Sequence, residues 1–73
     1  MEFASWLTAR LASQRRTQTA VARELGVTQA AVSQWCGGVY APTSDRLDAL
    51  LTYLACDDGD AREAVRLLAA RAA

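Results

Sequence analysis

Apolar residues recur along this chain at steps of three and four positions, which is the period of a helix that buries one side. Phe3, Leu7 and Leu11 form the first such stripe and predict a helix over residues 2–15. No segment alternates apolar and polar residues as a half-buried strand does, and no internal repeat is present. The pattern therefore predicts a protein built from helices alone.

Two short helices are expected next, separated by a turn at Gly26. Thr17 is placed to cap the first of them, over residues 18–25, because its hydroxyl can accept an amide hydrogen from the first helical turn. Gly26 stops this helix, since glycine readily adopts a left-handed conformation. Thr28 is placed to cap the following helix, which ends at Cys36. The residues of that helix expected to face inward are Val32, Trp35 and Cys36.

A fourth and a fifth helix are predicted after the central loop. Thr43 or Ser44 caps the fourth helix. Its apolar face comprises Leu47, Leu50, Leu51 and Leu54. Asp60 and Glu63 have the spacing of a capping box and predict a fifth helix over residues 60–72. The side of this helix expected to cover the core comprises Ala61, Val65, Leu68, Ala69 and Ala72.

Length and composition fit a single domain over residues 1–73. The chain is 52% apolar, rich in alanine and poor in glycine and proline, which favours helix. We therefore expect an all-α fold, a compact bundle of about five helices. A core of this size contributes only about 3–5 kcal/mol, so the bundle needs tight packing or a partner subunit.

Several functional classes are excluded by what the sequence lacks. No apolar run is long enough to cross a membrane, and the N-terminus lacks a basic-then-apolar secretion signal. The absence of histidine and of paired catalytic carboxylates argues against an enzyme and against a metal site. Cys36 and Cys56 are too few for a disulfide framework and are expected as buried thiols. We expect a cytoplasmic protein with no cofactor, no metal and no membrane partner.

Charge is balanced overall but unevenly distributed. Eight arginines face eight acidic residues, which gives a net charge of zero and a pI of about 6.1. Residues 1–40 carry a formal charge of +2 and residues 41–73 a charge of −2. Neutrality counts against a strong nucleic-acid binder, unless a locally basic face meets the nucleic acid and the acidic half points away.

The most informative stretch is residues 18–37, where two short helices meet with only a few residues between them. Ala22 sits where the two helices touch and where only a small side chain fits. Gly26, four residues later, takes a positive φ at the turn. The residues expected in the core between the helices are Val21, Leu25, Val27, Val32 and Trp35. This arrangement fits a helix-turn-helix at every constrained position.

The same stretch resembles the Cro/repressor (Xre-like) helix-turn-helix family of phages and bacteria. The resemblance rests on Thr17-Gln18 followed by Val21-Ala22, and on the turn Leu25-Gly26-Val27-Thr28-Gln29. It covers about residues 3–56, including the preceding helix, the glycine-containing loop and the proline before the fourth helix. The resemblance implies a lambda-repressor-like bundle that binds DNA and regulates transcription.

The resemblance also implies which residues contact DNA. In this family the exposed face of the third helix enters the major groove, where glutamine can bond adenine and alanine can touch a thymine methyl group. The positions on that face are Gln29, Ala30, Ser33 and Gln34. The residues expected to contact or flank phosphates are Arg15, Arg16, Thr17, Gln18, Thr28 and Tyr40.

Some positions depart from the family pattern. Val39 and Tyr40 follow the loop glycines, where members often carry lysine or arginine, and this weakens the grip on phosphates. Arg16 replaces a residue that is commonly apolar. Some members pair an arginine of the first helix with a glutamate at the end of the third. The aligned residues here are Leu11 and Cys36, which favours a packing role for Cys36.

These features favour a small transcriptional repressor that binds double-stranded DNA, at a palindromic operator, as a homodimer associated with the nucleoid. No small-molecule ligand is expected, so control would come from the concentration or turnover of the protein. Two alternatives remain open. The fold could serve as a protein-interaction module, for example an antirepressor, or as an antitoxin that represses its own operon.

The fifth helix, over residues 60–72, is the expected dimer element. One recognition helix reads only a few base pairs, whereas two copies about 34 Å apart read a palindrome. Leu67 lies off the apolar side assigned to this helix and would be exposed without a partner. The residues expected to contribute to the dimer contact are Trp6, Tyr53, Leu67 and Leu68.

Overall fold

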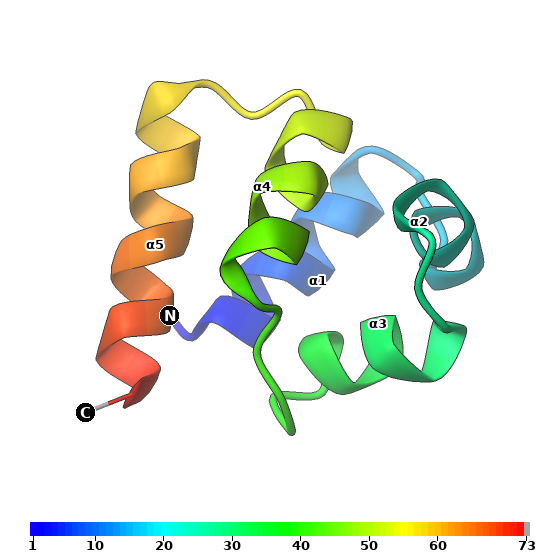
Figure 1. Cartoon of the computed structure of the whole chain (residues 1–73). Helices are drawn as coiled ribbons and strands as arrows, with labels where there is room; N and C mark the ends of the chain where they lie inside the picture. Colours follow the sequence, from blue (N-terminus) through cyan, green and yellow to red (C-terminus); the bar gives the residue numbers. More distant parts are fainter. Residues whose placement is uncertain (73) are drawn as a thin grey trace.

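The protein is described by a computed structural model that covers residues 1–72. These residues form five helices and no strand, which confirms the predicted all-α bundle (Figure 1). The helices are α1 (Phe3–Ser13), α2 (Gln18–Leu25), α3 (Gln29–Cys36), α4 (Ser44–Tyr53) and α5 (Asp58–Ala72). The side chain of Ala72, which was expected on the apolar side of the last helix, and all of Ala73 lie outside the described part.

Threonine hydroxyls start three of the helices. The Thr17 hydroxyl accepts the Ala20 N–H at 3.0 Å, and the Thr28 hydroxyl accepts the Ala31 N–H at 3.1 Å. Thr43, and not Ser44, is the cap of α4. Each cap satisfies one of the amides that a helix start leaves without a partner. The predicted starts of α2, α3 and α4 are therefore confirmed.

Helix α1 ends two residues earlier than the apolar pattern predicts, because Arg15 adopts a left-handed conformation with φ 54°. The Arg16 N–H donates to the Leu11 carbonyl at 2.9 Å, and the Arg15 N–H donates to the Ala12 carbonyl at 3.1 Å. This pair of hydrogen bonds, from the two residues after the C-cap to carbonyls of the last helical turn, is common at helix C-termini, usually with glycine in the left-handed position. An arginine there gives no such signal in the sequence.

The start of α5 also differs from the expectation. The predicted capping box between Asp60 and Glu63 is wrong, because Asp57 is the residue that caps this helix. Its carboxylate accepts the Asp60 N–H at 2.7 Å, and the Asp57 N–H donates back to the Asp60 carboxylate. Glu63 instead forms an ion pair with Arg66 at 2.7 Å on the exposed side of α5.

The core draws side chains from every helix. Leu7, Val21, Val32 and Leu50 are fully buried and come from α1, α2, α3 and α4. Trp35 and Trp6 add aromatic volume at 6% and 7% exposure. In Figure 1, α4 lies between α5 on one side and the α2–α3 pair on the other, with α1 packed behind. The predicted inward positions of α2, α3 and α4 are confirmed.

Helix α5 covers the core with a side that overlaps the predicted one only in part, since Ala61 and Leu68 are half-buried against the core as expected. Leu67 is 4% exposed and Ala64 is fully buried, whereas Val65 is 54% exposed. The expectation that Leu67 would be left in solvent is therefore wrong. The reason is that α5 packs against α1, where the small Ala64 allows close approach and the larger Leu67 fills the space beside it.

Two of the aromatic residues expected at a dimer contact are engaged within the chain. Trp6 is buried, and the Arg10 guanidinium lies 5.1 Å from the centre of its ring. Tyr53 is half-buried, and the Arg16 guanidinium lies 4.4 Å from the centre of its ring. Such cation–π contacts cover the ring faces. Of the expected dimer residues, buried Trp6 and Leu67 therefore offer no surface to a second chain, while Leu68 is half-buried.

Candidate nucleic-acid interface

The turn between α2 and α3 holds the two helices at a fixed angle. Gly26 has φ 69°, which glycine adopts without strain. The Val27 N–H donates to the Ala22 carbonyl at 3.0 Å and closes the end of α2. Ala22 itself is 4% exposed, in the region where α2 packs on α3. The geometry is that of a helix-turn-helix, and it determines which side of α3 remains open.

One continuous face of α3 is open to solvent. It consists of the residues predicted to read bases: Gln29, Ala30, Ser33 and Gln34. Val32 and Trp35 hold the opposite face in the core. The exposed set has no charge, and each member is small or ends in a hydroxyl or an amide. Amides and hydroxyls both donate and accept hydrogen bonds, which suits the mixed groups on base edges.

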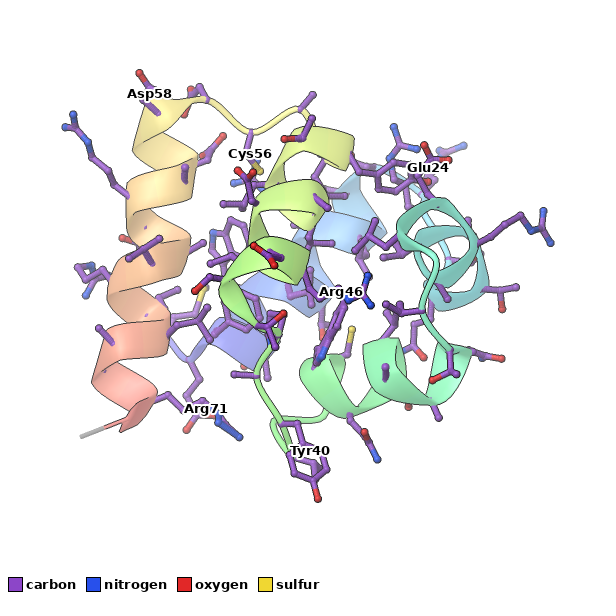
Figure 2. The ribbon with its side chains drawn as sticks, viewed as in Figure 1. Glu24, Tyr40, Arg46, Cys56, Asp58 and Arg71 are labelled. Carbon is purple, nitrogen blue, oxygen red and sulfur yellow. The ribbon has the colours of Figure 1, made fainter. Side chains whose placement is uncertain are left out.

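The loop after α3 extends this face. Gly38 reverses the chain with φ 77°, and the Tyr40 N–H lies 3.4 Å from the Gln34 carbonyl. Val39 and Tyr40 are 60% and 61% exposed. Figure 2 shows the Tyr40 side chain pointing away from the body of the molecule, at the edge formed by α3. A phenol in this position can donate a hydrogen bond to a phosphate but supplies no charge.

Arg71, near the end of α5, holds this loop in place. Its guanidinium donates hydrogen bonds of 2.9 Å to both the Gly38 and the Val39 carbonyls (Figure 2). The sequence predicts no role for Arg71. Nothing in the local pattern marks it, because an arginine in the last turn of a helix is usually a solvated charge that complements the helix dipole.

The start of α2 lies close to the end of α3. Gln18 is half-buried, and its side chain and that of Thr8 lie near the Cys36 thiol, while the Thr8 hydroxyl donates to the Cys36 backbone carbonyl at 3.4 Å. Burial raises the pKa of this thiol more than these two side chains lower it, so it is a neutral packing group. The Gln18 and Thr19 amides are the first of the helix and lack helical acceptors, which leaves them available to a phosphate.

The two arginines before α2 are placed differently from each other. Arg15 is exposed. Arg16 stacks on Tyr53 and donates to the Gln14 side chain at 3.0 Å, and Gln14 in turn donates to the Leu54 carbonyl at 2.9 Å. Arg16 therefore joins the end of α1 to the end of α4. This is a structural role that the sequence analysis did not assign to it.

The interface as a whole is electrically neutral. No charged residue occurs between Glu24 and Asp45, a stretch that includes all of α3 and the loop after it. Arginines occur at its margins: Arg15 and Arg16 before α2, Arg23 within α2, and Arg46 of α4, whose guanidinium donates to the Leu25 carbonyl at 3.4 Å (Figure 2). Attraction to the phosphate backbone therefore depends on few charges. Hydrogen bonds from the α3 face are expected to contribute a correspondingly larger share of the free energy of DNA binding.

Comparison with known proteins identifies the class to which this geometry belongs. A family model described as Helix-turn-helix matches residues 7–59, from the second turn of α1 through α4 to the first residues of α5. The chain belongs to this family, whose members are DNA-binding transcription regulators of the Xre/Cro type. No curated protein and no solved structure matches the chain significantly. The resemblance stated from the sequence is confirmed.

Two other kinds of site have no counterpart in residues 1–72. No described helix combines the length and the apolarity needed to cross a bilayer. Across the same residues, no three potential metal ligands gather into one group. The α3 face and the adjoining loop are therefore the surface on which a proposal about function rests.

Proposed function

We propose that this protein is a transcriptional repressor that binds a palindromic operator as a homodimer. The observation that carries the proposal is the uncharged polar face of α3, with Gln29, Ala30, Ser33 and Gln34 all exposed in a family that binds DNA. Occupying the operator would exclude RNA polymerase. Binding to the chromosome would also place the protein in the cytoplasm, with the nucleoid.

The two glutamines are the main candidates for base contacts. Gln29 and Gln34 are five residues apart, which is about 7.5 Å along the helix axis. Base pairs stack at about 3.4 Å, so the two side chains can address separate positions of one half-site. Glutamine can bond adenine through two hydrogen bonds, while Ala30 between them can contact a thymine methyl group.

Phosphate contacts would orient the protein on the duplex. We assign them to the first amides of α2, to Thr17 and Thr28 at the helix starts, and to Tyr40. Arg15 is exposed two residues before Thr17, the N-cap of α2. Arg16 is exposed as well, but its Nε–H donates to Gln14 and its guanidinium lies over the Tyr53 ring, so its contribution to DNA binding is expected to be smaller than that of Arg15.

The proposal is tested by gel shift with DNA that flanks the protein's own gene, against random DNA of equal length. Gln34→Ala should cost roughly 1–3 kcal/mol on the preferred fragment and little on random DNA. Ser5→Ala, an exposed polar substitution on α1, is the matched control and should change neither affinity. An equal loss on both kinds of DNA would contradict base reading by Gln34.

One observation favours a second candidate function. The uncharged stretch between Glu24 and Asp45 is also compatible with a surface that binds a protein, as an antirepressor or an antitoxin does. The same gel shift separates the two functions. A wild-type chain that prefers no fragment, even at low salt, would replace the repressor proposal by the protein-binding one.

A further inference from the structure

A cavity of about 560 Å³ lies where the start of α1, the last turns of α5 and the loop after α3 meet. Figure 1 shows the N-terminus beside the C-terminal half of α5, and α1 and α5 pack against each other. The apolar part of the lining comprises Phe3, Ala4, Leu67 and Ala70. Gly38 brings the loop beside the α3 face into the same lining. The cavity therefore borders both the core and the surface proposed to bind DNA.

Two side chains of opposite charge also line this cavity, Glu2 and Arg71. Both are exposed. They do not form an ion pair with each other, and neither forms one with any other of residues 1–72. The Glu2 side chain does not cap α1 either. The cavity thus combines one anionic group, one cationic group and an apolar surface, and its volume lies in the range of small-molecule sites.

We propose that this cavity binds a hydrophobic α-amino acid, and that the bound ligand weakens the binding of DNA. The ligand carboxylate pairs with Arg71, its ammonium group pairs with Glu2, and its side chain lies against Phe3 and Leu67. This departs from the sequence-based expectation that no small molecule binds. The binding site is independent of the proposed function, whereas its effect on the operator rests on that function.

The charge pattern selects this class of ligand. A simple anion would be repelled by Glu2, and a simple cation would be repelled by Arg71. An amino acid carries both charges a few bonds apart and has no net charge, so it can meet both groups at once. An apolar side chain is required because most of the remaining lining is apolar, and burial of apolar surface contributes to binding.

The geometry of the guanidinium determines the direction of the effect on DNA binding. Arg71 uses a single nitrogen, Nη2, for both of its hydrogen bonds to the loop, one to the Gly38 carbonyl and one to the Val39 carbonyl. A carboxylate binds an arginine most strongly through two parallel N–H groups. The two pairs of parallel donors are Nε with Nη2 and Nη1 with Nη2, so each pair includes Nη2.

A ligand carboxylate at either donor pair therefore displaces one of the two loop carbonyls from Arg71. The loop then loses part of its attachment to α5 and becomes more mobile. Because this loop adjoins the α3 face, its ordering has to be recovered when DNA binds, which costs affinity. The amino acid is thus expected to act as an inducer that releases the operator.

The first experiment measures ligand binding to the full chain without DNA, by isothermal titration calorimetry. L-phenylalanine is the probe and should bind with a Kd below about 1 mM. Phenethylamine lacks the carboxylate and should bind at least about tenfold more weakly. Phenylpropionate lacks the amine and should bind about threefold to fivefold more weakly, since the pair with Glu2 is exposed. Glycine lacks the side chain and should bind at least about tenfold more weakly.

Two substitutions locate the site. Ala70→Trp fills the cavity with an indole ring and should abolish phenylalanine binding. Glu2→Gln should weaken phenylalanine about threefold to fivefold and should tighten phenylpropionate, because a repulsive charge is removed. The matched controls are Ala49→Trp on α4 and Glu24→Gln on α2, which are exposed positions outside the cavity and should leave both affinities unchanged. Thermal melts establish that each variant remains folded.

The effect on DNA is measured by gel shift on the preferred fragment, with and without saturating phenylalanine. The wild-type chain should lose about threefold to tenfold in affinity, which corresponds to one hydrogen bond. Ala70→Trp should bind the fragment as the wild type does without ligand, and phenylalanine should not change its affinity. This variant separates the action of the ligand in the cavity from any general effect of an added solute.

Three results would overturn the inference. Phenylalanine that does not bind up to about 10 mM, or that binds Ala70→Trp as well as the wild type, would exclude the site. Binding that leaves the affinity for DNA unchanged would refute the displacement of the loop. Failure of the proposed function gives a different result. A chain that prefers no DNA fragment would still bind phenylalanine in the calorimeter, with the same dependence on Glu2 and Ala70.

Discussion

Among residues 1–72, two residues other than glycine hold left-handed backbone. Arg15 and Ala55 both have φ 54°, and each follows the last turn of a helix. The side chain of an L-residue crowds the backbone in this conformation, which costs roughly 1–2 kcal/mol. The hydrogen bonds that close α1 and α4 are therefore formed against local strain at each of these two positions.

Relief of this strain at Ala55 is expected to stabilise the protein. Ala55→Gly removes an exposed methyl group with no packing to lose and allows the left-handed conformation. After the greater backbone entropy of glycine in the unfolded chain is subtracted, the gain is about 0.5–1 kcal/mol, or a few degrees in Tm. Ala49→Gly, at an exposed position inside α4, is the matched control and should destabilise by about 1 kcal/mol. A lower Tm for Ala55→Gly would refute the strain at that position.

At the scale of helices, α1 and α5 are joined by one partly buried ion pair. Arg10 donates to Asp60 at 3.0 Å, and this hydrogen bond is the main reason that the pKa of Asp60 lies below its ordinary value. A carboxylate with a lowered pKa in the folded state stabilises that state above its unfolded pKa of about 3.9. The contribution is lost as the pH falls below that value and Asp60 takes up a proton.

Substitution of Asp60 should therefore change how the free energy of unfolding depends on pH in the acidic range. Asp60→Asn is expected to lower the free energy of unfolding near neutral pH and to bring the variant closer to the wild type below about pH 4. Chemical denaturation at several pH values measures this. Glu24→Gln, at an exposed carboxylate of α2, is the control. If the free energies of unfolding of Asp60→Asn and wild type differed by the same amount at all pH values, the ion pair would not be the cause of the loss of stability.

Helix α5 also acts on the DNA-facing loop through Arg71. Arg71→Ala frees the Gly38 and Val39 carbonyls, so the loop should become more mobile and the affinity for operator and random DNA should fall alike. A plot of log affinity against log salt should keep its slope, because Arg71 bonds the loop and not a phosphate. A slope reduced by about one unit would instead assign Arg71 to the DNA backbone.

The sequence does not determine which side of α5 faces the core, and the reason is physical. The helix is rich in alanine, leucine and valine, so more than one of its sides is apolar, and periodicity favours the Val65 side over the Leu67 side only weakly. Packing against α1 decides which side of α5 is buried. The same limit applies to Arg71 and Arg16, whose roles depend on neighbours 32 and 37 positions away.

Strong local signals explain why the rest of the fold was predictable. The starts of α2 and α3 were predicted because a threonine hydroxyl caps each helix within its own first turn. The open face of α3 followed from the same local geometry, since Val32 and Trp35 have to point inward. The end of α1 was missed because Arg15 occupies a position where glycine is the usual signal.

At the scale of the whole molecule, DNA binding is expected to depend only weakly on salt. Four arginines per chain border the interface, Arg15, Arg16 and Arg23 at or near the start and body of α2 and Arg46 at its end, and α3 has no charge. Since each neutralised phosphate adds about −0.9 to the slope of log affinity against log salt, the slope should be no steeper than about −4 per chain. A titration of operator DNA at several salt concentrations measures it.

A designed charge in the loop checks the same point. Val39→Lys, at an exposed position beside Tyr40, should steepen the salt slope by about one unit per chain and tighten binding at low salt. Ser5→Lys adds the same charge on α1 and should leave the slope unchanged. Equal effects of both lysines would show that net charge, and not the position of the loop, sets the response to salt.

The hydrogen bonds from Arg71 to the loop carry a thermodynamic consequence. Because α5 packs against α1 and also supplies Arg71 to the DNA-facing loop, whatever orders α5 also orders the surface beside α3. Coupling between two binding events is reciprocal, so if pairing of the chains tightens operator binding by some factor, operator DNA tightens pairing by the same factor. Such a regulator would assemble most readily on its own site, and occupancy would rise more steeply with protein concentration than for an isolated monomer.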